Sequence, residues 1–382
     1  MKTPFKKILF ALLMAILLVP LIPAKWSTFS KTVPLAGEAL IFKMPSFSFS
    51  GYFSRAYQDS FSDYFSHTFH NRAFYIRAYN EINYDLLRFP SSSSGIIIGK
   101  KDFLFLRSYV DNYIGSNCLG KRQIEKNVGL LKKIQDSLKR KNIDLIILFT
   151  PGKASFYSEY LPDKYLENKK DSNNYLLYSS ELIRQGINFI DLNKYFKILK
   201  SKSKYPLFSV WGTHWTHYGM SIGADTVIKY IEKIRAIKMP DFDYSSIKVS
   251  TDIQKPDYDV EDLLNLYFPL AHTPLAYPNY SYKRNPTNYK PSVLVIGDSY
   301  WGNLCYKGIP QNVFKQDIFW RYFKDEYINN IRQKTPVLNL NIKEKILQQD
   351  VIIIEATEEN YNNFPYGFSE HVDFLFQKEK FN

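Results

Sequence analysis

The sequence predicts an α/β fold in which helices cover both faces of a parallel sheet. Three apolar runs, at residues 142–149, 292–297 and 350–355, are rich in β-branched residues and have the length of buried strands. Between them, several segments carry apolar residues every three or four positions, a spacing that predicts amphipathic helices. Because strands that alternate with helices form parallel sheets with both faces buried, this order indicates the α/β class.

Length and composition indicate a folded protein with a full core. The chain has 382 residues, and 45% of them are hydrophobic. Its formal net charge is +13, but no basic cluster with interleaved aromatic residues resembles a nucleic-acid-binding module, so we expect no nucleic-acid partner. The basic charge fits an anionic membrane surface or an acidic polymer better. The 30 Tyr and 29 Phe fit either a compositional bias or a groove whose rings stack on sugars.

Residues 1–25 have the overall pattern of an export signal, with three lysines before an apolar run from Ile8 to Val19. No small-x-small cleavage pattern follows, because Pro23 and Lys25 occupy positions where small residues are favoured. We therefore expect an uncleaved signal anchor, a single transmembrane helix whose positive end faces the cytoplasm. The main domain would then lie outside the cytoplasmic membrane, in the periplasm if the organism is Gram-negative.

Residues 26–90 are polar and aromatic and predict a juxtamembrane helical segment, with a helix over 59–88. The four serines at 91–94 form a short linker. Residues 91–382 are expected to form the main domain.

The elements of the main domain follow in chain order. Residues 95–106 predict a β-hairpin, because two apolar runs flank a Gly-Lys-Lys-Asp turn. Residues 238–290 are rich in Pro, Asn, Asp and Tyr with little periodicity, which predicts an irregular insertion or a lid. The other expected elements are a helix over 123–141, a strand over 142–149, a helix over 174–185, a short strand over 187–191, a helix after Gly219, and the strands at 292–297 and 350–355.

Ser299 is the best candidate nucleophile, since Gly297-Asp298-Ser299-Tyr300 follows a buried strand and precedes a helix. Such a turn exposes the Ser hydroxyl, and the first N–H groups of the helix can stabilise an oxyanion. Taken alone, the motif fits an ordinary helix cap better than a nucleophile turn, because Asp and Ser are favoured cap residues. Lys153 and Glu355 also lie at predicted strand ends, and the carboxyl ends of parallel strands meet at one edge of a sheet.

His214 is the candidate base. A Ser hydroxyl becomes a good nucleophile only when a neighbouring imidazole takes its proton, and His214 lies in a loop between Trp211 and Trp215. A structural histidine between two indoles is the alternative. His217 is expected to have a cap or surface role, because the helix that starts near Thr216 would point it elsewhere.

We expect no metal site and no cofactor. A His214/His217 metal pair lacks an obvious third ligand, and two cysteines cannot form a zinc site. Cys118 and Cys305 fit either a disulfide or two free thiols.

Several motifs together resemble the alginate O-acetyltransferase AlgX/AlgJ-like family. They are Thr213-His214-Trp215-Thr216 upstream of Gly297-Asp298-Ser299-Tyr300, preceded by Gly95-Ile96-Ile97-Ile98-Gly99-Lys100 and Pro151-Gly152-Lys153. The resemblance covers roughly residues 61–360. It includes the motif order, because the His motif precedes the Ser motif in this family, whereas ordinary SGNH esterases have the Ser first.

This resemblance implies a three-layer SGNH-hydrolase-like domain in which Ser299 and His214 are catalytic. It also implies O-acetylation of an extracytoplasmic polysaccharide, and a membrane-bound O-acyltransferase partner that supplies the acetyl groups.

One position departs from the family pattern Asp-x-His-Trp, because Gly212 stands where the Asp is expected. That Asp orients the imidazole, and in the serine-protease template its loss costs about ten-thousand-fold in turnover. Asp259, Asp262 and Glu355 are the candidates to replace it. The alternatives are a Ser–His dyad oriented by a backbone carbonyl, or a protein that binds its polymer without turnover.

The predicted function is transfer of an acetyl group to sugar hydroxyls through an acyl-enzyme on Ser299. The backbone N–H of Ser299 and the side chain of Asn303 are expected to hold the oxyanion, and Lys153, Trp215 and Tyr300 are further oxyanion or substrate candidates. A carbohydrate O-acetyl esterase uses the same parts with water as acceptor. A catalytically inert, polysaccharide-binding scaffold of the acetylation machinery is the third alternative.

Overall fold

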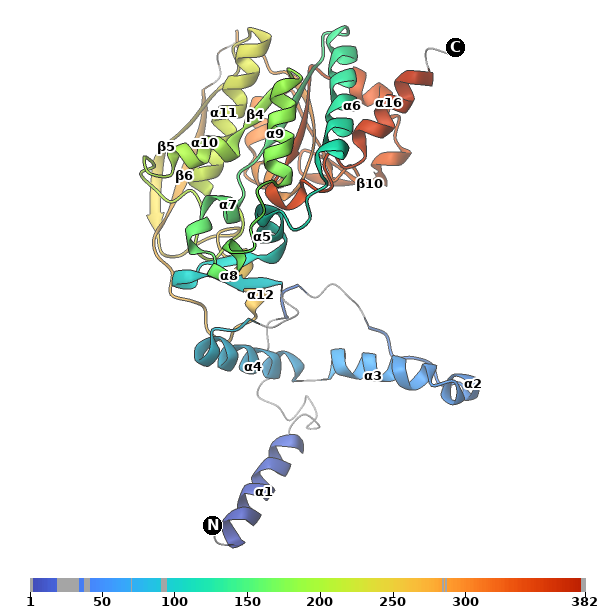
Figure 1. Cartoon of the computed structure of the whole chain (residues 1–382), viewed down its shortest axis with the longest axis vertical. Coiled ribbons are helices and arrows are strands. Elements are labelled where there is room, and N and C mark those ends of the chain that lie inside the picture. Colours follow the sequence, from blue (N-terminus) through green and yellow to red (C-terminus); the bar gives the residue numbers. More distant parts are fainter. Residues whose placement is uncertain are drawn as a thin grey trace. The chain divides into compact units, whose positions relative to one another are not determined.

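The computed structural model describes residues 3–18, 34–37, 42–69, 71–90, 95–283, 285 and 287–378. The chain divides into two compact units (Figure 1). The N-terminal unit consists of Met1–Ser94 and Glu261–Leu270, and the large unit consists of Gly95–Val260 and Ala271–Asn382.

The N-terminal unit is helical. Its helices are α1 Thr3–Leu18, α2 Phe49–Phe53, α3 Ala56–Thr68 and α4 Arg72–Leu87, so the single helix predicted over 59–88 is broken between α3 and α4. The break follows from Phe69, whose extended backbone (φ −62°, ψ 143°) ends α3. Residues 261–270 belong to this unit because the side-chain amide of Asn80 donates to Leu264 O at 2.8 Å and Arg77 Nη1 donates to Leu266 O at 2.9 Å.

The structure gives no support to the expected membrane anchor at residues 1–25. In the part of the chain that the structure describes, no helix, α1 included, is both long and apolar enough to cross a membrane. The predicted segment beyond Leu18 lies outside the described residues.

The large unit is built on a seven-stranded sheet with the order β10-β9-β8-β7-β11-β3-β4. The five strands from β8 to β4 are parallel, whereas β9 and β10 pair antiparallel at one edge. The predicted parallel sheet is therefore confirmed for these five strands, and the complete sheet is mixed. The strands are β3 Asp144–Phe149, β4 Phe189–Asp191, β7 Ser292–Gly297, β8 Gln316–Arg321, β9 Asp325–Ile328, β10 Ile331–Pro336 and β11 Val351–Ala356.

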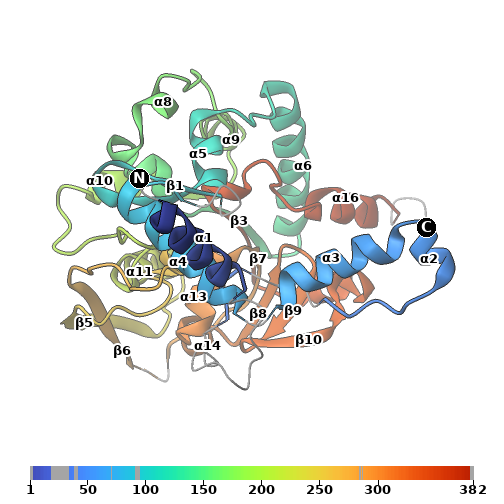
Figure 2. The same cartoon turned by 90° about the horizontal axis from the view of Figure 1, so that it is seen from below.

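Two hydrophobic clusters on opposite faces of the sheet confirm the three-layer α/β architecture. In β3, Ile146 and Leu148 belong to one cluster, and the alternate residues Leu145, Ile147 and Phe149 belong to the other. The two sets of covering helices can be followed in Figure 2. One face carries α5 Arg107–Ile114, α7 Lys153–Phe156, α10 Leu192–Leu199, α11 His217–Arg235, α13 Ser299–Tyr306 and α14 Ile309–Val313; the other carries α6 Lys121–Lys139, α9 Asn174–Arg184, α15 Ile342–Leu347 and α16 Phe368–Lys378.

The predicted hairpin at 95–106 is confirmed by the antiparallel pairing of β1 Ile96–Ile98 with β2 Leu104–Leu106. Residues 238–290, expected to be irregular, instead contain a second hairpin of β5 Asp241–Ser250 and β6 Leu275–Lys283, as well as α12 Asp259–Leu264. A register shift between Asp243 and Ser246 interrupts the alternation of side chains that would have indicated β5. The remaining short helix is α8 Asp163–Leu166, and 3-10 turns lie at 100–102, 158–160, 337–339 and 358–360.

Candidate active site

Ser299 lies at a sharp turn between β7, which ends at Gly297, and α13, of which it is the first residue. Asp298 caps α13 by accepting a hydrogen bond from Tyr300 N at 2.9 Å, and its other oxygen accepts from Thr357 N at 2.9 Å. The helix cap is thus Asp298, and the hydroxyl of Ser299 is left for another partner. Gly297 is required here, because a Cβ at this position would lie 2.4 Å from Glu355 Oε2.

The hydroxyl of Ser299 meets the ring of His214. Its Oγ is 2.8 Å from His214 Nε2, and Nδ1 on the other side of the ring contacts Asp259 Oδ2. The second oxygen of Asp259 accepts from Thr213 N at 2.7 Å, so one carboxylate fixes both the ring and its backbone. Burial lowers the pKa of His214, but the charge and hydrogen bond of Asp259 outweigh it and raise this pKa above its ordinary value. The arrangement suits a base that takes a proton from Ser299.

Gly212 makes room for the segment that brings in Asp259. A Cβ at Gly212 would lie 2.7 Å from Pro256 O and 2.8 Å from Asp257 O, so the backbone of 256–257 fills the volume of a side chain there. Ser209 fastens this segment, since its Oγ donates to Asp257 O and accepts from Gly212 N. Asp259, 45 residues after His214, therefore contacts the ring in place of the acid that is missing at Gly212.

Lys153 supports the loop of His214. Its Nζ donates to Val210 O at 2.8 Å and to Gly212 O at 2.6 Å, and only 1% of the residue is exposed. Burial lowers the pKa of Lys153 to about 7, and the charge of Asp259 acts in the opposite direction. Lys153 is thus buried behind the loop, which corrects the expectation that it contacts the oxyanion or the substrate.

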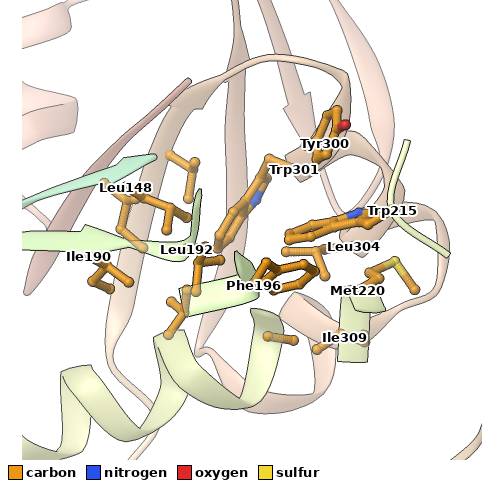
Figure 3. Packing of buried hydrophobic residues seen from close by; sticks show 14 of the residues in the cluster. Leu148, Ile190, Leu192, Phe196, Trp215, Met220, Tyr300, Trp301, Leu304 and Ile309 are labelled. Carbon is orange, nitrogen blue, oxygen red and sulfur yellow. The ribbon is translucent and has the colours of Figure 1, made fainter. Parts of the chain in front are cut away.

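Trp215 and Tyr300 are likewise buried supports (Figure 3), contrary to the expectation that they contact the substrate. Tyr300 donates its hydroxyl to Thr213 O at 2.8 Å, which joins α13 to the His214 loop. Trp215 is 1% exposed, and its ring centroid lies 5.1 Å from that of Tyr300 and 6.1 Å from that of Phe196.

Glu355 and Asp262 do not orient His214, because Asp259 and Ser299 occupy its two ring nitrogens. Glu355 is fully buried beneath the turn at Ser299, where it accepts from Thr150 Oγ1 at 2.7 Å and from Asp298 N at 2.8 Å. Burial raises the pKa of Glu355 well above its ordinary value, so its neutral form is favoured. Asp262 lies further along α12, in the part that belongs to the N-terminal unit.

Ser299 opens into a cavity of about 430 Å³, here named the Ser299 cavity. Asn303, one helical turn after Ser299, lines it, and its buried side-chain nitrogen has no hydrogen-bond partner among the residues that the structure describes. A buried amide donor of this kind beside Ser299 suits the oxyanion role expected for Asn303. Sequence reasoning missed the wall formed by β8 and β9 because it did not recognise these strands. The other lining residues are Lys255, Pro256, Gly302, Tyr306, Phe319, Arg321, Tyr327 and Asn330.

The remaining candidates are separate from this chemistry. His217 contacts Lys255 O through Nε2 at 3.1 Å, and burial lowers its pKa to about 4, so it is neutral near pH 7. Within the described residues, no group of three His, Cys, Asp or Glu side chains could hold a metal ion. Cys118 and Cys305 are free thiols.

The chain resembles known proteins in sequence and in structure. Residues 96–318 match the family described as SGNH hydrolase-like domain, acetyltransferase AlgX. Two relatives named probable alginate O-acetylase AlgJ are 26% identical over 153 residues (Azotobacter vinelandii) and 22% identical over 149 residues (Pseudomonas putida). Each match covers 39% of this chain but only 37% of the relative. The solved O-acetyltransferase domain of Pseudomonas putida AlgJ is 15% identical with a TM-score of 0.46, covering 70% of this chain and 92% of that one.

Proposed function

The chain belongs to the family of SGNH hydrolase-like domains of the acetyltransferase AlgX, and we propose that it transfers acetyl groups through Ser299 to polysaccharide hydroxyls. The observation that carries the proposal is the contact series from Asp259 to His214 to Ser299. A carboxylate, an imidazole and a hydroxyl in this order are the parts of a serine acyl-transfer site. The relatives named alginate O-acetylases support the same reaction and a polysaccharide acceptor.

In the first half-reaction, Ser299 Oγ attacks the carbonyl carbon of the acetyl donor while His214 Nε2 takes the hydroxyl proton. The negative charge that develops on the carbonyl oxygen is stabilised by Ser299 N–H and by the free amide of Asn303. Collapse of this intermediate breaks the bond to the leaving group, which receives the proton from His214. The result is an acetyl ester on Ser299.

In the second half-reaction, a sugar hydroxyl replaces the leaving group. His214 takes its proton, the sugar oxygen attacks the ester carbonyl, and the same donors hold the oxyanion. Ser299 then leaves with the proton from His214, and the acetylated sugar is released. Asp259 stabilises the imidazolium that forms in each half, and Lys153 and Tyr300 hold the loop in place.

We also propose that this reaction takes place outside the cytoplasmic membrane, next to a membrane-bound O-acyltransferase that delivers the acetyl groups. The support is the N-terminal segment, in which Lys6 and Lys7 precede apolar side chains of α1 that are exposed, such as Ile8 (60%) and Phe10 (65%). A phosphatase fused after Asn382 should be active if the C-terminus is extracytoplasmic. An inactive but correctly expressed fusion would contradict this location.

The function is tested with the purified full chain and a chromogenic acetyl ester, followed by addition of an oligosaccharide acceptor. We expect the wild type to release the chromophore and to form acetylated sugar detected by mass, and Ser299→Ala to lose at least about a thousandfold of this rate. Equal background rates for both proteins would refute an enzymatic role. Chromophore release without acetylated sugar would assign the chain to the carbohydrate esterases instead.

A further inference from the structure

Glu355 joins three strand ends beneath Ser299, although the reaction above does not use it. It is the penultimate residue of β11, which lies between β7 and β3 in the sheet. The side chain is fully buried, and each of its oxygens reaches a residue that follows one of these neighbours. Oε1 accepts from Thr150 Oγ1 at 2.7 Å, after β3, and Oε2 accepts from Asp298 N at 2.8 Å, after β7.

The contact with Asp298 N bears on the geometry of the turn at Ser299, residues 297–299. A Cβ on Gly297 would lie 2.4 Å from Glu355 Oε2, so this carboxyl group packs directly against the backbone where β7 ends. Ser299 follows at once, and its Oγ lies 2.8 Å from His214 Nε2, the distance that the proton transfer needs. A displacement of about 1 Å at such a position can cost a hundredfold in rate.

Glu355 and Asp298 form a pair of buried carboxyl groups, and neither forms an ion pair within the part of the chain that the structure describes. Glu355 accepts two hydrogen bonds, whereas Asp298 accepts four. The donors to Asp298 are Tyr300 N, Thr357 N, Thr357 Oγ1 and Asn360 Nδ2. Because two neighbouring buried carboxylates repel each other, the group with more donors suits the negative charge and the other suits the neutral form.

The surroundings of Glu355 agree with this assignment. Burial and the charge of Asp298 both raise the pKa of Glu355 well above its ordinary value. The phenol of Tyr366 also faces the pair, and burial raises its pKa well above the ordinary value, so it is neutral too. Among the described residues, Glu355 thus has a negative charge and neutral groups around it.

We propose that Glu355 is a positioning residue whose neutral side chain fixes the turn at Ser299 so that Ser299 Oγ faces His214 Nε2. A neutral carboxyl group keeps an oxygen for Asp298 N without placing a second charge beside the carboxylate of Asp298. This proposal rests on the proposed function and adds to it a residue that neither attacks the donor nor transfers a proton.

Substitutions of Glu355 in the full chain distinguish a neutral positioning role from a charged one, with a chromogenic acetyl ester as substrate. Glu355→Gln keeps an oxygen for Asp298 N, and its amide can donate to Thr150 Oγ1, since a hydroxyl also accepts. We expect its kcat to stay within about twofold of the wild type. Glu355→Leu removes the acceptor of a buried N–H, and its kcat should fall about a hundredfold at unchanged KM.

A milder variant and a control separate this role from folding. Thr150→Val removes only the donor to Oε1, and it should lower kcat about fivefold at unchanged KM. Glu326→Leu removes another buried carboxyl group, which accepts from Trp320 Nε1 at 3.1 Å and pairs with Lys345 at 3.0 Å. It should lower the melting temperature but leave kcat within about twofold of the wild type.

Two further measurements do not require catalysis. The infrared difference between the wild type and Glu355→Gln, at a pH of about 8.5, should contain the C=O band of a protonated carboxyl group. Hydrogen exchange of the backbone at residues 297–299 should be faster in Glu355→Leu than in the wild type.

The proposal is overturned if Glu355→Gln loses as much activity as Glu355→Leu, if Glu355→Leu or Thr150→Val keeps the wild-type kcat, or if the carboxyl band is missing. A wild type without activity would instead refute the proposed function. The infrared band and the hydrogen exchange would then still decide whether Glu355 is neutral and holds the turn, so the two failures are distinguishable.

Discussion

Asp259→Asn is expected to lower kcat about ten-thousand-fold while the chain stays folded. The substituted side chain keeps an oxygen for Thr213 N but presents an amide N–H to His214 Nδ1 in place of the carboxylate contact. The imidazole proton then moves to Nε2, the atom 2.8 Å from Ser299 Oγ, which can no longer take the hydroxyl proton. In the serine-protease template this change costs about 10⁴ in kcat, or about 5.4 kcal/mol of transition-state stabilisation.

The assay is hydrolysis of a chromogenic acetyl ester, followed from pH 5 to 9. Because Asp259 raises the pKa of His214 and the base must be neutral, activity of the wild type falls as the pH drops through that raised pKa. The residual activity of Asp259→Asn should fall only at lower pH. Asp262→Asn is the matched control and should stay within about twofold of the wild type. Retention of more than a tenth of the activity by Asp259→Asn would refute the assignment.

Three further outcomes follow from the described contacts. Asn303→Ala should lower kcat about a hundredfold with little change in KM, because a donor to the oxyanion is lost. A variant whose KM rises while its kcat stays unchanged would contradict this role. Lys153→Met should lower kcat about tenfold at constant KM. Because burial lowers the pKa of Lys153 to about 7, the wild type should gain stability as the pH rises from 7 to 10.5, and the variant should lack this gain. If the melting temperatures of the wild type and the variant change with pH in the same way over that range, the prediction is wrong. Glu358, the first residue of the 3-10 turn 358–360, is buried and accepts a hydrogen bond from Ser155 N at 3.1 Å; burial raises its pKa to about 7. The wild type should therefore lose about 3 kcal/mol of stability as the pH rises from 4.5 to 7, and Glu358→Gln should remove this loss, which denaturant unfolding at a series of pH values measures.

Strands β3, β7 and β11 could be predicted because both faces of each are covered. In β3 and β11 every residue is buried, which leaves a continuous apolar run in the sequence. The antiparallel strands β9 and β10 at one edge gave no such signal. β10 is mostly exposed, and its two-residue turn from β9 is Asn329-Asn330, where both residues have positive φ but neither is the glycine that commonly marks such turns.

The site could be predicted only in part, for geometric reasons. Ser299 follows a central strand, so its position at the carboxyl edge of the sheet could be inferred from the apolar run before it. The choice between Asp259 and Asp262 could not, because both residues lie on one short helix and only the path of residues 256–257 past Gly212 decides which carboxylate reaches His214. Lys153 was misassigned because a lysine after a strand gives no sign of whether its ammonium group is buried.

In this chain the acid that contacts His214 is Asp259 and not a residue at position 212, so a different segment of the chain holds this acid. An acid two residues before the histidine would be fixed by the same loop as the ring. Asp259 instead begins α12, and the rest of this helix, from Glu261 on, belongs to the N-terminal unit, where Asn80 donates to Leu264 O. Gly212→Asp cannot restore the family arrangement, since its Cβ would meet the backbone of Pro256 and Asp257, so orientation of His214 in this chain requires the segment that leads to α12.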